Sequence, residues 1–217
     1  MKGIFITGTD TNVGKTYIGC KIAAELTARN INVIPRKPVE SGCTRINNEL
    51  IPEDAVKLKQ AAQSTESIEK ICPWRFEPAI SPAEAARKNN QHISLNQLSQ
   101  ACRINTAKYG FLLIEGAGGF YSPICENALN ADLAHTIHLP LLLVAENRVG
   151  CINQVLLCLR AIEHYGLNIK AIALNHSNIS GNINSHHHEL LRYTQTPVFV
   201  FDKNQSSASK LVDHLLA

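Results

Sequence analysis

The segment GTDTNVGKT, residues 8–16, carries the residue types that hold a phosphate. It follows the apolar run Ile4–Ile6 and ends in Gly14, Lys15 and Thr16. In a loop between a strand and a helix, backbone N–H groups and the partial positive charge of the helix start hold a polyphosphate. The lysine then contacts the β- and γ-phosphates of a nucleotide, and the threonine hydroxyl binds Mg²⁺. The segment therefore predicts a phosphate-binding loop.

The spacing within this segment departs from the standard pattern. Five residues separate Gly8 from Gly14, one more than the pattern has, and Thr9 stands in the place of the first glycine. An ordinary strand-to-helix turn that contains Gly-Lys-Thr is the alternative. The order of strand, loop and helix favours the phosphate loop.

Two carboxylates are candidate ligands for the metal of such a site. Glu115 ends the apolar run Phe111–Ile114 and is followed by the glycine-rich segment Gly116–Gly119. Ligands of open α/β sheets bind at the carboxyl ends of strands, and Mg²⁺ prefers carboxylates together with phosphate oxygens. A solvated residue at the rim of the sheet is the alternative for Glu115. Asp54 is the second candidate, although its position by itself favours a helix N-cap.

Lys37 follows the apolar run Ile31–Ile34 and precedes Pro38, so it also lies where a strand ends. A second lysine near the terminal phosphate would offset the charge that spreads over a transferring phosphoryl group. A solvated loop lysine is the alternative.

Apolar runs of strand length must position these residues. Most are continuous, which is typical of strands that are buried on both faces of a parallel sheet. Residues 15–29 and 152–164 have helical spacing, and Gly166 is a candidate helix stop. Strands that alternate with helices predict an α/β fold with a doubly wound, mostly parallel sheet, helices on both faces, and one domain over residues 1–217. The expected strands are 4–6, 31–34, 111–114, 141–144, 169–174 and 198–201.

Composition narrows the possible partners and the compartment. The net charge of +3 comes from 21 basic and 18 acidic residues, which gives no support to nucleic acid or an anionic membrane as a partner. The seven cysteines are scattered without a Cys-x-x-Cys pair, as expected for reduced thiols. The first residues contain no long apolar stretch, and the longest apolar run, residues 139–145, is too short to span a bilayer. We therefore expect a cytoplasmic protein.

Five segments, in order along the chain, resemble motifs of the dethiobiotin synthetase family. The first is the segment of residues 8–16, because the phosphate loop of that family has the same longer spacing. Lys37–Gly42 resembles the motif Lys-Pro-Val-x-Ser-Gly, and Glu115–Gly119 resembles Glu-Gly-Ala-Gly-Gly. The remaining matches are Gly150–Asn153 and Leu174–Asn175. The resemblance runs from residue 1 to about residue 176, and it implies a P-loop NTPase-like fold.

The resemblance implies a ligase of biotin biosynthesis, which closes the cyclic urea of dethiobiotin from 7,8-diaminononanoate and CO₂ at the expense of ATP. A carbamate and a carbamic–phosphoric anhydride are the implied intermediates. No covalent enzyme intermediate is needed, so positioning and charge stabilisation would carry the catalysis. In the family, the helix that begins at Gly150–Asn153 comes from the neighbouring subunit. A homodimer with shared sites is therefore implied.

Family roles transfer to the matching positions. Lys15 and Lys37 would be catalytic, with ATP as co-substrate and Mg²⁺ held by Thr16, Asp54 and Glu115. The implied nucleotide-binding residues are Asn12, Val13, Gly14, Lys15, Thr16, Tyr17, Asp54, Glu115, Gly116, Ala117, Gly118, Asn175 and His176. The implied substrate-binding residues are Thr11, Ser41, Gly118, Gly150, Cys151, Ile152 and Asn153. The free N–H groups at 150–153 would bind the substrate carboxylate. Without the resemblance, a plain loop-to-helix junction is the preferred interpretation there.

Two positions depart from the family pattern. Asn12 stands where many members carry glutamate. Members often have a Gly-x-x-Pro segment that packs on adenine, and residues 197–204 contain no such segment. Asn175 and His176 remain candidate base contacts, and selectivity for adenine over guanine or cytosine is left open.

A different class of protein also uses unusual phosphate loops: switch ATPases that partition chromosomes or select division sites. Those proteins carry an additional lysine early in the loop, and residues 8–13 contain none. The C-terminal segment 209–216 is a candidate membrane-targeting helix, but it has one lysine, whereas surface-seeking helices are rich in lysine and arginine. The synthetase is therefore the favoured prediction.

Overall fold

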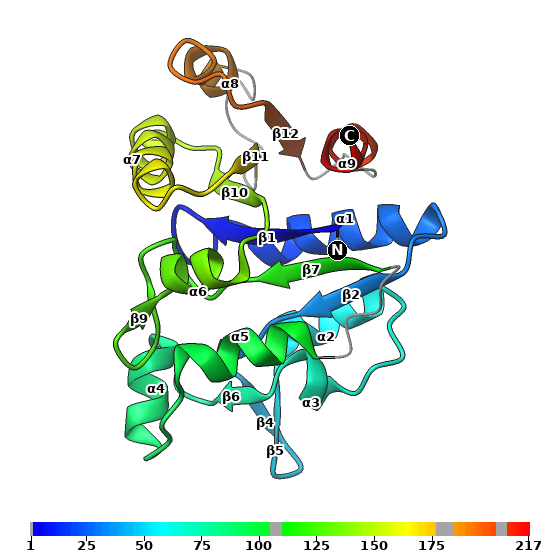
Figure 1. Cartoon of the computed structure of the whole chain (residues 1–217), viewed down its shortest axis with the longest axis vertical. Coiled ribbons are helices and arrows are strands. Elements are labelled where there is room, and N and C mark those ends of the chain that lie inside the picture. Colours follow the sequence, from blue (N-terminus) through cyan, green and yellow to red (C-terminus); the bar gives the residue numbers. More distant parts are fainter. Residues whose placement is uncertain (1, 105–109, 177–184, 203–207) are drawn as a thin grey trace.

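The computed structural model describes residues 2–104, 110–176, 185–202 and 208–217. Six parallel strands form the main sheet in the order β12-β11-β10-β1-β7-β2 (Figure 1). These strands are β1 (Lys2–Gly8), β2 (Val33–Arg36), β7 (Phe111–Glu115), β10 (Leu141–Glu146), β11 (Ile169–His176) and β12 (Val198–Asp202). The six strands expected from the apolar runs are confirmed, and so is the parallel sheet.

The strand order places the start of the chain in the middle of the sheet. From β1 the chain crosses to β2 at one edge and returns to β7; only later does it fill the other side with β10, β11 and β12. Connections therefore leave the centre of the sheet in opposite directions. In open parallel sheets, this arrangement opens a crevice at the carboxyl ends of the central strands.

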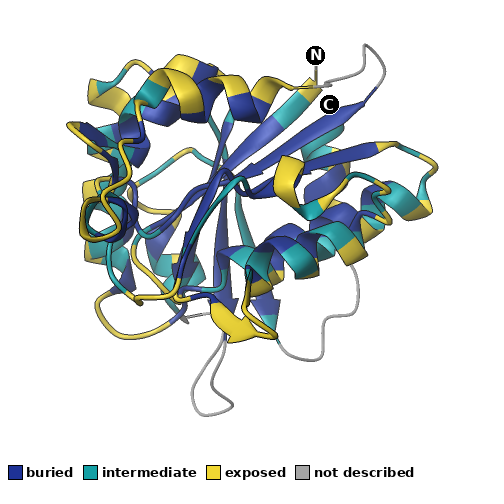
Figure 2. Ribbon diagram, turned by 90° about the horizontal axis from the view of Figure 1, so that it is seen from below, coloured by how far each residue is buried: buried dark blue, intermediate teal, exposed yellow. Residues whose placement is uncertain are grey.

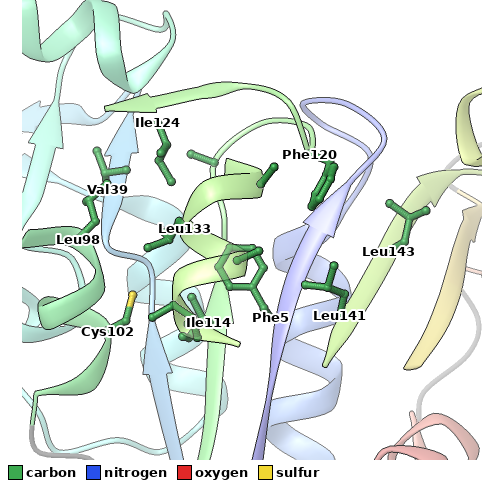
Figure 3. Packing of buried hydrophobic residues seen from close by; sticks show 14 of the residues in the cluster. Phe5, Val39, Leu98, Cys102, Ile114, Phe120, Ile124, Leu133, Leu141 and Leu143 are labelled. Carbon is green, nitrogen blue, oxygen red and sulfur yellow. The ribbon is translucent and has the colours of Figure 1, made fainter. Parts of the chain in front are cut away.

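Side chains alternate between two apolar cores. In β1, Phe5 joins the core under α5 (Leu95–Arg103), α6 (Asn130–Ile137) and α7 (Cys151–His164), as Figure 3 shows in part. Ile4 and Ile6 point to the other core, which is covered by α1 (Lys15–Ala28), α2 (Glu53–Ala61) and α9 (Ser209–Leu216). Figure 2 shows the sheet buried between these layers, with exposed residues on the outer faces of the helices. Helices on both faces of the sheet are thus confirmed.

The crossover from β2 to β7 carries an insertion. In it, β3 (Val39–Ser41) pairs with β6 (Trp74–Phe76), and β4 (Thr44–Ile46) pairs with β5 (Glu49–Ile51). The same stretch contains α2, α3 (Ile68–Ile71), α4 (Pro82–Lys88) and α5. The remaining elements are β8 (Pro123–Cys125), β9 (Ala128–Leu129) and α8 (Ser185–Leu190).

The end of α1 explains why β2 begins two residues later than the sequence predicted. Asn30 has a left-handed backbone with φ of 58°, and the N–H of Ile31 donates to the carbonyl of Leu26 at 3.0 Å. Residue 31 therefore still completes the end of α1, and β2 begins at Val33 instead. Gly166, with φ of 63°, ends α7 in the way expected for a helix stop.

Two further features of the described residues bear on the sequence expectations. None of the described helices has both the length and the apolar character that a membrane crossing requires. All seven cysteines are free thiols.

Candidate active site

The loop between β1 and α1 has the backbone of a phosphate cradle. Gly14 is the N-cap of α1 with φ of 97°, a conformation that L side chains rarely adopt. A Cβ atom at this position would lie 2.0 Å from the side-chain nitrogen of Asn175. That nitrogen donates to the carbonyl of Val13 at 3.1 Å. Only glycine fits here, and the end of β11 supports the loop.

Lys15 is buried within this loop. Its Nζ donates to the carbonyl of Asp10 at 2.8 Å. Burial foremost, together with the nearby charge of Lys37, lowers the pKa of Lys15 to about 8, although nearby carboxylates act in the opposite direction. A phosphate group beside Lys15 would favour its charged form.

Lys37 lies where the carboxyl ends of β2 and β7 meet. Its Nζ is 2.6 Å from Glu115 Oε1 and 3.3 Å from Asp54 Oδ2, and it donates to the carbonyl of Gly116 at 3.3 Å. Burial by itself would lower the pKa of Lys37, but the surrounding carboxylates, Glu115 foremost, raise it. Lys37 is therefore a buried ammonium group and not a solvated loop lysine.

The three predicted metal ligands lie around this lysine. The Thr16 hydroxyl donates to Glu115 Oε1 at 2.8 Å. Glu115 is fully buried and its Oε2 atom has no hydrogen-bond partner among the described residues. Burial works to raise the pKa of Asp54, but the charge of Lys37 and a hydrogen bond from Thr16 outweigh it and lower the pKa. One hydroxyl and two carboxylates, one with a free oxygen, fit the oxygen ligands that Mg²⁺ takes beside phosphate.

The helix-cap interpretation of Asp54 is wrong. α2 begins at Glu53 with Pro52 at its N-cap position, and Asp54 lies in the first turn. Its carboxylate points to Lys37. The helix start is held by Glu40 instead, whose Oε1 accepts from the N–H of Asp54 and Oε2 from that of Ala55, both at 3.0 Å.

Asn130, the first residue of α6, holds the glycine-rich loop after β7. Its fully buried side-chain amide donates to the carbonyls of Ala117 and Gly119, and its Oδ1 accepts from the N–H of Ala117. Gly118 has φ of 74°, and a Cβ there would lie 2.5 Å from Ser122 Oγ. Neither Glu40 nor Asn130 belonged to the residues predicted from sequence, because both act on backbone groups that are distant along the chain.

These residues enclose one pocket of about 330 Å³. It contains both lysines, the three candidate metal ligands and three of the candidate substrate contacts. Its lining residues are Thr11, Asn12, Gly14, Lys15, Thr16, Lys37, Glu40, Ser41, Asp54, Glu115, Ala117 and Gly118. Burial foremost, together with the charge of Asp54, raises the pKa of Glu40 to about 7, although Lys37 and the two backbone N–H groups oppose the rise.

The remaining candidates lie outside this lining. Val13 and Gly116 are buried within the two loops, whereas Tyr17 is exposed and its hydroxyl donates to the carbonyl of Asp202 at 3.3 Å. His176 ends β11; it is buried, and neither ring nitrogen has a partner among the described residues. Lys203 and Asn204, which end the segment compared with the adenine-packing motif, lie outside the described residues.

The segment Gly150–Asn153 does not reach the pocket within the described part of a single chain. Gly150 is the N-cap of α7 with φ of 89°, and Cys151 is buried beneath the helix start. Ile152 is half-buried and Asn153 is exposed. The structure therefore brings the predicted phosphate, metal and Ser41 positions together in one pocket, but these four residues lie outside that pocket.

A parallel sheet whose first strand leads through a glycine-bounded loop and a lysine into a helix defines a P-loop NTPase-like α/β protein. A family model described as an AAA domain matches residues 2–200. The ATP-dependent dethiobiotin synthetase BioD of Vesicomyosocius okutanii is 40% identical over 204 residues, 94% of this chain and 91% of the relative. The synthetase of Ruthia magnifica is 35% identical, with 94% and 92% covered. The chain belongs to the dethiobiotin synthetase family, and it is an enzyme of the ligase type.

Solved structures show the same fold at low identity. The MinC:MinD cell division complex of Aquifex aeolicus matches with a TM-score of 0.57 and 13% identity, covering 99% of this chain and 85% of that chain. ParA of pNOB8, solved with nonspecific DNA, matches with a TM-score of 0.53 and 14% identity, with 94% and 85% covered. These likenesses support the fold alone. Membership of the synthetase family favours the ligase over the switch ATPase.

Proposed function

We propose that this chain is an ATP-dependent dethiobiotin synthetase, which closes the cyclic urea of dethiobiotin from 7,8-diaminononanoate and CO₂ in biotin biosynthesis. Its relatives are named as ATP-dependent dethiobiotin synthetases, which supports the overall reaction. The observation that carries the proposal is the pocket in which Lys15 and Lys37 meet Thr16, Asp54 and Glu115 beside a glycine-rich loop.

The proposed chemistry requires no covalent bond to the protein. One substrate amine adds to CO₂ and loses a proton, giving a carbamate. A carbamate oxygen then attacks the γ-phosphorus of ATP and ADP leaves, giving a carbamic–phosphoric anhydride. The second amine attacks the carbonyl carbon, and the ring closes as phosphate and a proton leave. Rate enhancement would come from alignment of the reacting groups and from stabilisation of phosphoryl charge.

The residues of the pocket divide between these tasks. The backbone of residues 12–17 would hold the phosphates, and the ammonium groups of Lys15 and Lys37 would stabilise the transferring phosphoryl group. Thr16, Asp54 and Glu115 would hold Mg²⁺, which when bound offsets the charge of the phosphate oxygens. The Oε2 atom of Glu115, which has no hydrogen-bond partner among the described residues, supports this assignment.

The substrate side of the site would be completed by a second copy of the chain. Thr11, Ser41 and Gly118 line the pocket and would contact the diamine or its carbamate. Gly150–Asn153 lie outside that pocket, at the start of α7. We propose that the backbone N–H groups of this helix start enter the site of the neighbouring subunit in a homodimer and bind the substrate carboxylate there.

The nucleobase would contact the end of β11. Asn175 supports the phosphate loop through Val13, and His176 has two free ring nitrogens among the described residues. We propose a cytoplasmic location, which the free cysteines support. Neither nucleic acid nor a membrane is proposed as a partner.

The direct test is to incubate the purified protein with the diamine, bicarbonate, Mg²⁺ and ATP, and to detect dethiobiotin by mass. Product that requires all four components is expected. An ATP hydrolysis rate that does not depend on the diamine but changes when lipid or DNA is added would instead support the switch ATPase. The same assay with GTP and CTP measures nucleobase selectivity.

A further inference from the structure

A carboxylate from outside α2 caps that helix. The first N–H groups of a helix have no partner within it, and the side chain of Pro52 at the N-cap position can accept no hydrogen bond. Glu40 takes this role, because its two oxygens accept from the N–H groups of Asp54 and Ala55, both at 3.0 Å. The start of α2 is therefore fixed by a residue that precedes Asp54 by fourteen positions.

Glu40 is itself held firmly. It lies in β3, which pairs with β6 in a register that places Glu40 opposite Arg75. The residue is only 6% exposed, and its neighbour Val39 is in the apolar core. A paired and buried strand thus presents both carboxylate oxygens to the helix start, and the helix cannot shift relative to this strand without losing these hydrogen bonds.

The same short segment contacts Asp54 a second time. Lys37, three residues before Glu40, has its Nζ 3.3 Å from Asp54 Oδ2. One contact therefore holds the main chain of Asp54 and the other its carboxylate. Loss of the main-chain contact would let the first turn of α2, with the Asp54 carboxylate, move relative to Thr16 and Glu115.

We propose that Glu40 is a positioning residue that holds Asp54 in place for Mg²⁺. Position 40 is the variable residue of the Lys-Pro-Val-x-Ser-Gly motif, so the family resemblance assigns it no role. The inference rests on the proposed function, because it takes Asp54 as a metal ligand. Groups that orient metal ligands typically contribute about 10- to 100-fold to metal affinity.

The test measures binding and not turnover. A fluorescent ATP analogue is bound to the full chain, and Mg²⁺ is titrated. We expect Glu40→Ala to need at least about tenfold more Mg²⁺ for half-saturation, while binding of the analogue in EDTA stays near the wild-type level. Glu40→Gln keeps one acceptor but sets an NH₂ group against a backbone N–H, so its shift should be intermediate. Glu53→Gln is the matched control, because it removes an exposed charge from the same helical turn and leaves the cap intact.

Several outcomes would overturn the inference. A folded Glu40→Ala variant with the wild-type Mg²⁺ response would do so, as would an equal loss of binding with and without Mg²⁺. If the alanine variant does not fold, Glu40→Gln decides; failure of both to fold would give Glu40 a role in folding alone. If the wild-type chain shows no response to Mg²⁺, the metal site fails, and the proposed function fails with it.

Discussion

At the scale of single residues, the pocket is organised around Lys37. Its ammonium group contacts Glu115 and Asp54, and both Lys37 and Glu115 are buried. A buried carboxylate without a partner destabilises the folded protein, because neither water nor a positive group compensates its charge. Lys37 therefore stabilises the folded protein and also contributes to the proposed chemistry.

Lys37→Ala should separate these two contributions. We expect turnover to fall at least about 100-fold, because one stabilising charge at the phosphoryl group is lost. The free energy of unfolding should fall by about 3–5 kcal/mol, because Glu115 stays buried without its positively charged partner. Lys57→Ala, at an exposed lysine of α2, is the control for both measurements. Urea titrations measure the stability of each variant, and product assays measure its turnover. Near-normal turnover in a folded Lys37→Ala variant would remove Lys37 from the mechanism.

The site residues that the sequence could predict are those whose side chains stand in a recognisable motif. Lys15, Thr16 and Glu115 stand in recognisable patterns next to strand ends, and the structure brings them together in one pocket. Glu40 and Asn130 are ordinary polar residues in the sequence. Their roles depend on backbone groups of other elements, which only the folded chain brings within reach. The roles of all site residues stay predictions.

At the scale of elements, the two loops of the pocket and the start of α2 are each stabilised by a side chain from another element. β11 supports the phosphate loop through Asn175, β3 supports α2 through Glu40, and α6 supports the glycine-rich loop through Asn130. Continuous apolar runs were enough to predict all six strands. Five of these strands are largely buried, and strands buried on both faces leave a simple pattern, whereas the edge strand β12 is mostly half-buried. The start of β2 was placed wrongly because a left-handed Asn30 extends the end of α1.

Asn130→Ala tests the support of the glycine-rich loop. The change leaves the buried carbonyls of Ala117 and Gly119 without their donor, so the free energy of unfolding should fall by about 1–3 kcal/mol. Turnover should fall as well, because Gly118 lines the pocket. Asn96→Ala, at an exposed position of α5, is the control, and denaturant titration with product assays is the measurement. Unchanged stability in Asn130→Ala would show that the loop holds its own shape.

At the scale of the whole molecule, α7 and the residues before it expose large apolar side chains that the described part of a single chain does not cover. Leu157 on this helix is 63% exposed, and Val149 just before it is 85% exposed. Large exposed apolar side chains close to a proposed substrate-binding segment are consistent with a subunit interface. The single-domain organisation over residues 1–217 and the homodimer both stay predictions.

Leu157→Arg tests the proposed homodimer. We expect the wild-type chain to sediment as a dimer and this variant to dissociate, because a charge would be buried in the interface. Turnover should fall with the dimer fraction if each site needs residues 150–153 of the other subunit. Ile46→Arg, at a 52% exposed position of the β4–β5 hairpin, should change neither property. A fully active monomer in sedimentation experiments would contradict the shared site.

The charges that line the pocket bear on how its ligands arrive. Two ammonium groups, Lys15 and Lys37, face three carboxyl groups, Glu40, Asp54 and Glu115. Such a lining attracts a bare polyanion less strongly than the two lysines alone would, since repulsion from the acidic groups offsets part of the attraction of the lysines. A triphosphate already chelated by a divalent cation meets far less repulsion. The chelate, and not the uncomplexed nucleotide, is therefore the species to which this cavity is electrostatically matched.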